Sequence, residues 1–392
     1  MCLHLGATAA LIVWLRSTTP SVRTVLVGAV LFRLVALPML PSLSDDGYRY
    51  LWDGKVVVEA GVSPYALRPS DPQLRDLQGS VEYGRMNSQE YYSVYPPVPQ
   101  VGFAVAAALG GLADWRVGWW VWKLLMVSAE GVAILLLLRG VGPRLTALYA
   151  WSPLAVVEVA GQGHTEALVL LGLALALQVD RWRWPAASIG LTLAGGTKLY
   201  PFLWLPQAWR REGWRGVAAS LCLVGLLAAP ISAPGALEHI GDSLRLFFGV
   251  FDEYAAPYLL FKSLLYPVLE EHAGAAASGT LAIAAVIGVA GLALTDDGTY
   301  GSWRRALAVG VVGLVCAAST LHPWYWLPVL YVVPLLNQIR PLLWLITWSS
   351  VSYLGYVLEL SSTFVTTIGW GGAAVLWWAD RRATVRRRSA EP

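Results

Sequence analysis

Two adjacent carboxylates, Asp45 and Asp46, open the part of the chain that is richest in groups able to do chemistry. They directly follow the apolar run 25–40 and stand in the segment SDDGYRYLWDG of residues 44–54. Charged groups beside hydrocarbon are costly, and they usually line a water-filled cavity and mark a site. Two neighbouring carboxylates raise each other's pKa, which suits one of them to accept a proton from a hydroxyl. We therefore expect residues 41–93 to form a loop that does chemistry at a membrane surface.

The composition predicts a membrane protein around this loop. Hydrophobic residues make up 56% of the 392 and charged residues only 14%, against roughly 25% charged residues in soluble domains. Apolar runs near 20 residues in length recur along the chain, and each can cross about 30 Å of hydrocarbon. The net charge is +3, and the basic residues fall in short clusters between apolar runs. This pattern is a topology signal and does not indicate a nucleic-acid partner.

The first half of the chain follows the positive-inside rule only in part. The run 3–15 lacks a basic start and a cleavage site, which favours a short first span or an interfacial helix over a signal sequence. Arg16 and Arg23 are expected inside, with 25–40 leading out to the loop. Residues 94–112 would then return inward to Arg116, and 117–138 would go out again. This path leaves Arg139 and Arg144 outside, against the rule.

The next two apolar pieces, 145–157 and 167–179, leave two readings open. They form either one crossing plus a re-entrant piece or two crossings. The basic group 181–184 favours the first reading, with the turn 161–166 outside. Residues 186–209 then form a broken pair of short helices, interrupted at 195–198. Irregular backbone at membrane depth is tolerated only where it is buried in protein or lines a cavity.

The second half predicts a second outer loop at 232–272, further crossings, and a basic cytoplasmic tail at 381–392. Anionic lipid favours such a tail on the cytoplasmic side. The fold is therefore expected to be all-α. It would be a polytopic transmembrane bundle of about eleven or twelve helices that forms one domain over 1–380. Short helices are expected in its long first outer loop, and no internal repeat at a fixed period is visible.

Several further ionisable residues could take part in the chemistry, and each also has a purely structural explanation. Lys198 follows two glycines in an apolar run, so it either snorkels to the interface or pairs with an anion such as a phosphate. His322 stands among interfacial aromatic residues, where an imidazole can donate to phosphate or exchange a proton. His164 and Glu166 flank a turn of small residues, and Glu166 alone would complement a helix N-terminus. Lys123 and Glu130 are seven residues apart and so on one face of a helix, where mutual neutralisation or neutralisation by a neighbouring helix is the favoured account.

No metal or nucleotide signature is present. The five histidines show no paired spacing, and Cys2, Cys222 and Cys316 support neither a disulfide framework nor a thiolate metal site. A P-loop and a dinucleotide fingerprint are also missing. An activated substrate would therefore have to come from the membrane, and neither a cofactor nor a divalent metal is expected.

Several segments resemble, in matching order over about residues 25–340, the GT-C glycosyltransferases. The closest likeness is to the bacterial polyprenyl-phosphate-mannose-dependent mannosyltransferases, including the GT87 group. The segments that carry the likeness are 46–54 (DGYRYLWDG), 61–65 (GVSPY), 95–97 (YPP), 163–167 (GHTEA), 197–201 (TKLYP) and 322–325 (HPWY). The first-loop pattern is fairly specific, and the later ones are individually weak.

The resemblance implies a membrane hexosyltransferase that inverts the sugar of a polyprenyl-phosphate donor, with mannose expected. The acceptor would be a lipid or glycan hydroxyl on the outer face of the plasma membrane. An acidic residue of the first loop would be the base, and the spacing to Arg and Tyr favours Asp46, although Asp45 stays open. The residues expected to bind substrate are Arg49, Tyr50, Asp53, Tyr95, His164, Glu166, Lys198, His322 and Tyr325. The rival reading is a multi-helix transporter or lipid flippase, which would more typically show a repeat between halves and midplane charges.

Overall fold

The structure, a computed structural model, describes residues 2–111, 114–179, 184–249 and 254–336, together with 353, 361, 364–372, 374, 375 and 378. These residues are helical or irregular, and no strand occurs among them. The predicted basic tail 381–392 and the basic group at 181–183 lie outside the described residues. Most of the predicted last helix pair, 342–378, lies outside them as well.

The described α-helices are interrupted many times by glycine and proline. They are α1 (Cys2–Ser17), α2 (Val22–Ala36), α3 (Asp46–Lys55), α4 (Val81–Arg85), α5 (Pro97–Ala106), α6 (Trp115–Ala150), α7 (Pro153–Ala155), α8 (Glu166–Ala176), α9 (Ala186–Gly195), α10 (Leu205–Glu212), α11 (Trp214–Leu227), α12 (Ala236–Gly249), α13 (Ala256–Leu269), α14 (Ala273–Leu294), α15 (Tyr300–Cys316) and α16 (Leu327–Val332).

Short π and 3₁₀ segments join or extend these helices. The π segments are η1 (Val56–Ala60), η3 (Ala107–Gly111) and η4 (Val156–Gly161). The 3₁₀ segments are η2 (Pro72–Leu77), η5 (Tyr200–Trp204), η6 (Ala229–Ser232), η7 (Glu270–His272), η8 (Pro323–Trp326) and η9 (Val333–Leu336). Residues 41–96 therefore carry α3, η1, η2 and α4, and residues 232–272 carry α12, α13 and η7.

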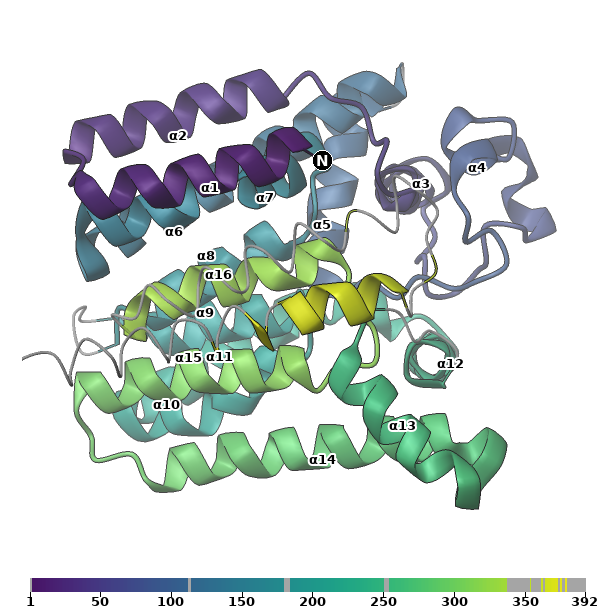
Figure 1. Cartoon of the computed structure of the whole chain (residues 1–392). Helices are drawn as coiled ribbons and strands as arrows, with labels where there is room; N and C mark the ends of the chain where they lie inside the picture. The colour runs from purple at the N-terminus through teal and green to yellow at the C-terminus, as the bar shows by residue number, and fades with distance from the viewer. Residues whose placement is uncertain are drawn as a thin grey trace, which may run out of the picture.

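The helices of the bundle run lengthwise between two ends (Figure 1). We call the end at which α3, α4, α12 and α13 gather the loop end. At the opposite end lie the α1–α2 and α14–α15 connections, and Arg211 of α10 binds Asp296 there at 2.6 Å. Hydrogen bonds from Arg211 and then Gln207 lower the pKa of Asp296, although burial opposes its ionisation. We call this end the basic end.

Two described helices are long and apolar enough to cross a membrane, or three if one bent pair is counted as a single span. The first is α6, which changes direction at Gly142 (φ 78°), directly before Pro143. The second is the α13–α14 segment, of which α14 alone has 22 residues, or about 33 Å. The bent pair joins 153–161 to Glu166–Ala176 at 116°. Because the other described apolar helices are shorter than 18 residues, the expected eleven or twelve crossings stay a prediction.

The path of residues 94–144 differs from the one expected. Helix α5 and η3 together have 15 residues, or about 22 Å, which is too short to cross hydrocarbon. Helix α6 begins at the loop end instead, where the rings of Trp115 and Tyr48 of α3 lie 5.4 Å apart. Arg116 therefore lies at the loop end. Arg144 lies at the basic end, where its Nε donates to the Leu15 carbonyl at 2.8 Å.

The two pieces left open by the sequence both extend between the two ends. The first leads from Arg144 to the turn 161–166 at the loop end, and α8 leads back. The Ala176 carbonyl accepts from Trp303 Nε1 at 2.9 Å, near the start of α15. Helix α8 packs closely on α9, since a Cβ at Gly172 would meet the Gly190 carbonyl oxygen at 2.3 Å. Both readings stay open, because the pair 153–161 and Glu166–Ala176 is bent by 116° and is either a broken span or a re-entrant loop.

Buried charges fasten α2 to α6. Arg33 donates to both Glu130 oxygens at 2.7 and 2.8 Å, and the Tyr149 hydroxyl donates to the same carboxylate at 2.7 Å. Lys123 donates to the carbonyls of Leu37 and Met39 that follow the end of α2. Glu130 is thus neutralised by Arg33 of the neighbouring helix, whereas Lys123 is hydrogen-bonded to carbonyl groups.

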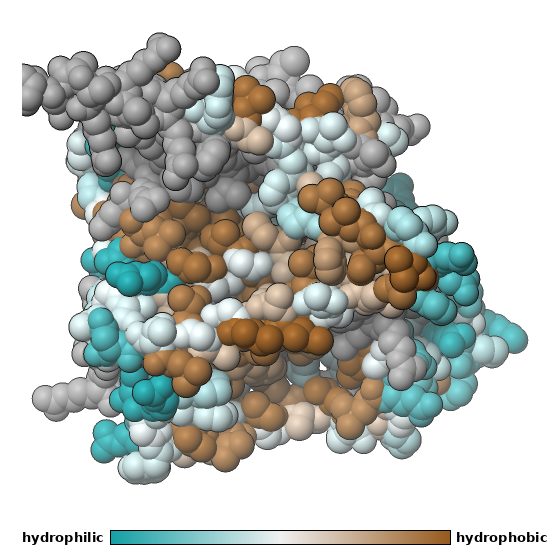
Figure 2. Space-filling model, turned by 60° about the horizontal axis from the view of Figure 1, so that its bottom comes forward, coloured by the Kyte–Doolittle hydropathy of each residue, from teal (hydrophilic) through white to brown (hydrophobic). Residues whose placement is uncertain are grey.

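The outer surface fits a lipid environment. Large apolar side chains are exposed on α2 and α14, including Val35 (80%) and Ile287 (65%). Figure 2 shows apolar side chains across the middle of one face, with polar side chains toward its left and right edges. Monomeric soluble proteins rarely expose such continuous apolar surface. The molecule is therefore described as an all-helical membrane protein.

Candidate functional site

A sharp turn at residues 161–166 brings the first outer loop against the core of the bundle. Gly163 has a φ of +65°, and its carbonyl accepts from Trp122 Nε1 at 2.7 Å. The Gln162 side-chain oxygen accepts from the backbone N–H groups of Ser42 and Leu43 at 3.1 and 3.0 Å. The segment that leads into the acidic pair is therefore fixed to the turn that carries His164 and Glu166.

The two aspartates differ in their surroundings. Asp46 is half-buried at the start of α3, whereas Asp45 is exposed just before it. Partial burial and then the charge of Asp46 raise the pKa of Asp45. The charge of Asp46 acts on Tyr95, His164, Lys198 and His322. These contacts favour Asp46 as the member of the pair that faces the other site groups.

His164 is buried among polar and aromatic side chains, and its Nε2 has no hydrogen-bond partner among the described residues. Its Nε2 lies 3.1 Å from Glu158 Oε2, and its Nδ1 lies 3.5 Å from the Tyr50 hydroxyl. Its ring is stacked on Trp324, with centroids 4.0 Å apart. The His322 ring is also stacked on Trp324, with centroids 4.6 Å apart. Trp324 thus joins both imidazoles in one aromatic cluster.

Burial lowers the pKa of His322 to about 4, although the charge of Asp46 opposes this effect. His322 is therefore neutral at pH 7. A neutral imidazole can donate one N–H to a phosphate oxygen, but it adds no positive charge. The expectation that His322 donates to a phosphate stays a prediction.

Lys198 lies in the turn between α9 and η5 and is paired with a buried carboxylate. Its Nζ lies 3.1 Å from Glu166 Oε1 and 4.9 Å from the centroid of the Tyr325 ring. The Lys198 side chain is 28% exposed, whereas that of Glu166 is 3% exposed. The second oxygen of Glu166 has no hydrogen-bond partner among the described residues. Lys198 is thus a partly accessible cation held by a carboxylate and an aromatic face.

Arg49 and Asp53 form an anchor inside the first loop. Arg49 Nε donates to Asp53 Oδ1 at 2.7 Å, and Arg49 also donates to the carbonyls of Ser88 and Tyr91 at 2.8 and 3.0 Å. The other Asp53 oxygen accepts from Ser93 at 2.5 Å. Both side chains are buried, and their charges act on Tyr95. These contacts hold the loop together, and a role of the two residues in binding substrate stays a prediction.

Tyr50 and Tyr95 belong to a buried aromatic cluster beneath the loop. The Tyr50 ring is stacked on Phe103 at 4.7 Å and meets the rings of Tyr95 and Trp122 at 5.0 and 5.6 Å. Burial and then the charge of Asp46 raise the pKa of the Tyr95 phenol. Tyr95 is thus a neutral hydrogen-bond donor beside Asp46, and Tyr50 links it to His164.

Sequence reasoning missed Glu158 and Gln162. Glu158 is an ionisable residue inside the apolar run 145–161, which is itself a signal of function in a membrane protein. Gln162 carried no such signal, because its role depends on the approach of residues 42 and 43. No group of three or more metal-ligating side chains occurs within the described ranges.

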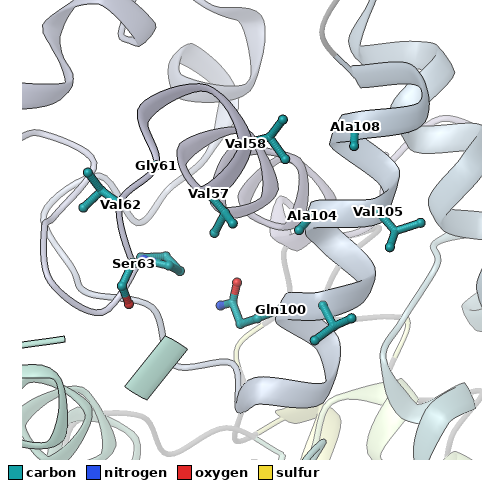
Figure 3. A pocket seen from close by; sticks show the side chains of 11 residues that line it. Val57, Val58, Gly61, Val62, Ser63, Gln100, Ala104, Val105 and Ala108 are labelled. Atoms are coloured by element: carbon teal, nitrogen blue, oxygen red, sulfur yellow. The ribbon is translucent and has the colours of Figure 1, made fainter. Parts of the chain in front are cut away.

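An apolar groove of about 570 Å³ lies beside the anchor, between η1, the segment 61–64 and the α5–η3 helix (Figure 3). Its lining is mainly valine and alanine, with Gln100 and Ser63 among them. Gln100 Nε2 donates to Asp53 at 3.0 Å. The groove has no charged lining residue and is separate from the cluster around Asp46.

No protein-family model matches the chain, and comparison with curated proteins and with solved structures gave no match.

Proposed function

We propose that this protein is a membrane glycosyltransferase that moves a hexose from a polyprenyl-phosphate donor to a hydroxyl of a glycolipid or glycan. The observation that carries the proposal is that the charge of Asp46 reaches both Lys198 and His322. These residues come from three distant parts of the chain. The order of motifs shared with polyprenyl-phosphate-mannose-dependent enzymes supports mannose as the sugar.

In the proposed reaction, Asp46 accepts the proton of the acceptor hydroxyl, and the hydroxyl oxygen bonds to the anomeric carbon. The bond from that carbon to the phosphate oxygen breaks, and its electron pair leaves with the phosphate. A positioned base contributes on the order of 10²–10⁴-fold to such a step. Stabilisation of the leaving phosphate is usually the largest electrostatic contribution.

Lys198 is the cation available for the phosphate. Its pairing with Glu166 offsets its charge before the donor binds, and the Tyr325 ring holds it from another side. We infer that the donor phosphate shares Lys198 with Glu166, while His322 donates one N–H to the phosphate. No metal or other cofactor enters this scheme.

The proposal also includes the location of the protein and its orientation in the membrane. We infer that the protein lies in the plasma membrane as a multi-pass bundle, with the loop end on the extracytoplasmic side. The basic end would then face the cytoplasm, together with the C-terminal tail. The positions of Arg144 and Arg211 at the basic end support this orientation under the positive-inside rule.

The direct test is release of free polyprenyl phosphate from radiolabelled polyprenyl-phosphate mannose by the purified protein, with a membrane glycolipid extract as acceptor. We expect release that depends on the acceptor and stops in the double variant Asp45→Asn/Asp46→Asn. Release that continues in that variant would show that the reaction does not need the acidic pair. A donor that stays intact under all conditions would contradict the proposed transferase activity.

A transporter or lipid flippase is the second candidate, and one observation favours it. Helices broken at membrane depth with charges at the break are typical of transporter sites, and Glu158 and Glu166 lie on either side of the 116° bend. Movement of an intact lipid-linked sugar across a vesicle membrane would support this candidate.

A further inference from the structure

The apolar groove beside the anchor is held open by fixed walls. A Cβ at Gly54 would lie 2.1 Å from the Phe103 carbonyl oxygen, so α3 packs directly on α5 where η1 begins to line the groove. The opposite wall, the segment 61–64, is fixed because the Ser93 N–H donates to the Pro64 carbonyl at 3.2 Å. At about 570 Å³, the groove is as large as the sites that hold small molecules in other proteins.

The lining of the groove suits a hydrocarbon chain. Val58 of η1 and Val101 and Val105 of α5 line it and are 37%, 51% and 36% exposed, so both walls reach the outer surface. None of the described residues that line it is charged. In a membrane protein, such a groove is within reach of lipid chains. Because lipid tails are as apolar as these side chains, apolar contact alone does not select one lipid over another. Selection therefore needs a polar group.

Gln100 supplies that polar group. It lines the groove, is 2% exposed, and its amide points into the space between the walls (Figure 3). Its Nε2 donates to Asp53 Oδ2 at 3.0 Å and to Ser93 Oγ at 2.7 Å. Because Asp53 is paired with Arg49 at 2.7 Å, its carboxylate can only accept, and this fixes the orientation of the amide. Gln100 Oε1 is then a buried acceptor without a partner among the described residues, which favours a ligand that carries an O–H or N–H.

The position of Gln100 relative to Asp46 fits an acceptor lipid. Asp53, which binds Gln100, lies seven residues after Asp46 on α3, two turns along the helix and on the same face. Two turns correspond to about 10 Å. A lipid whose chain lies in the groove therefore needs a polar head of this length to place a hydroxyl at Asp46. The donor fits less well, because its isoprenoid chain carries no O–H or N–H and its sugar hydroxyls stay beside the phosphate at Lys198.

We propose that the groove binds the apolar chain of the acceptor, which is a glycolipid. Gln100 Oε1 accepts a hydrogen bond from a hydroxyl or amide group at the junction of that chain and its head. This inference rests on the proposed function and narrows it, because the acceptor is then a lipid and not a free glycan. Gln100 is a binding residue in this scheme, and no covalent step takes place in the groove.

The first experiment measures binding and does not depend on transferase activity. The protein is placed in phosphatidylcholine nanodiscs that contain a monohexosyl diacylglycerol with a photoreactive diazirine on its acyl chain. Phosphatidylcholine with the same diazirine chain is the matched probe, because its head carries no O–H or N–H. Mass spectrometry should show that the glycolipid labels residues 56–64 and 100–108 at least about threefold more, the scale of one hydrogen bond. Equal labelling by the two probes would show that ordinary membrane lipid fills the groove, and would overturn the proposal.

Variants of the two walls test the groove itself. Val58→Trp and Val101→Trp each place an indole across it from an exposed position, so both should lower glycolipid labelling of the walls to the level of the phosphatidylcholine probe. Val132→Trp is the matched control, because Val132 of α6 is 45% exposed and does not line the groove. Gln100→Met should remove the preference for the glycolipid and keep the labelling by phosphatidylcholine. Unchanged labelling in both wall variants, or an unchanged preference in Gln100→Met, would overturn the proposal.

The closing experiment separates the acceptor from the donor. With a membrane glycolipid extract as acceptor, Val101→Trp should raise the extract concentration that gives half-maximal turnover several-fold and leave the donor KM unchanged. A rise in the donor KM, or displacement of the photoreactive glycolipid by polyprenyl phosphate, would assign the groove to the chain of the donor and overturn the proposal. Selective glycolipid labelling of the groove in a protein that never cleaves the donor would support the groove and contradict the proposed function.

Discussion

At the scale of single residues, the doubled aspartate is the sharpest question that the sequence left open. Asp46 is half-buried and its charge acts on Tyr95, whereas Asp45 is exposed. We predict that Asp46→Asn, which keeps the shape and removes the charge, lowers turnover by at least about a hundredfold, the scale of a lost general base. Asp45→Asn should keep most of the activity. Steady-state turnover of both variants is the measurement, and the opposite ranking would assign the base to Asp45.

The second residue-scale prediction concerns the donor phosphate. Lys198→Met keeps the apolar stem and removes the cation, so donor affinity should fall about tenfold to a hundredfold, as for a lost charged hydrogen bond. Lys55→Met is a matched control, because Lys55 also pairs with a glutamate, Glu59, at 3.7 Å. Donor binding by both variants is measured by titration. Normal binding by Lys198→Met would make Lys198 an interfacial anchor.

At the scale of elements, the turn at residues 161–166 determines whether the loop meets the bundle. Gly163→Ala is strained, because its φ is +65° and the new Cβ would lie 2.9 Å from Trp119. We predict a lower unfolding temperature in detergent together with a loss of turnover. Gly131→Ala lies in α6 with no atom within 4 Å of the added Cβ, and alanine favours a helix over glycine by about 1 kcal/mol. A Gly163→Ala protein as stable and active as Gly131→Ala would show that the turn tolerates change.

The approximate positions of many helices could be predicted from the sequence, because apolar runs and basic clusters are local features of the chain. We expected three features on the outer side of the membrane: the acidic pair, the turn at 161–166 and Lys198. The structure brings all three to the loop end. The path of 94–144 was wrong, because an apolar run does not show that α5 and η3 are too short to cross. The contacts of Arg49 inside the loop could not be predicted for a related reason: its partners Ser88 and Tyr91 lie about forty residues away.

At the scale of the whole molecule, the corrected path makes a prediction about sidedness. Single cysteines at Gly79 and Gly140, each with open space around the added Cβ, are placed in a variant whose three native cysteines are replaced. The structure predicts labelling of the two sites from opposite sides of the membrane, because residue 79 lies in the first loop and Arg144 lies at the basic end. Labelling of both from the same side would restore the path inferred from the sequence.

The central claim is that the loop end cleaves a lipid-linked sugar and does not carry it across the membrane. The most direct measurement reconstitutes the protein in vesicles with polyprenyl-phosphate mannose labelled separately in its lipid and its sugar, together with acceptor glycolipids. We predict that the two labels separate, because the sugar is transferred to the acceptor and free polyprenyl phosphate remains. Asp46→Asn should abolish this separation. Both labels arriving together in the opposite leaflet, with or without Asp46, would contradict the account.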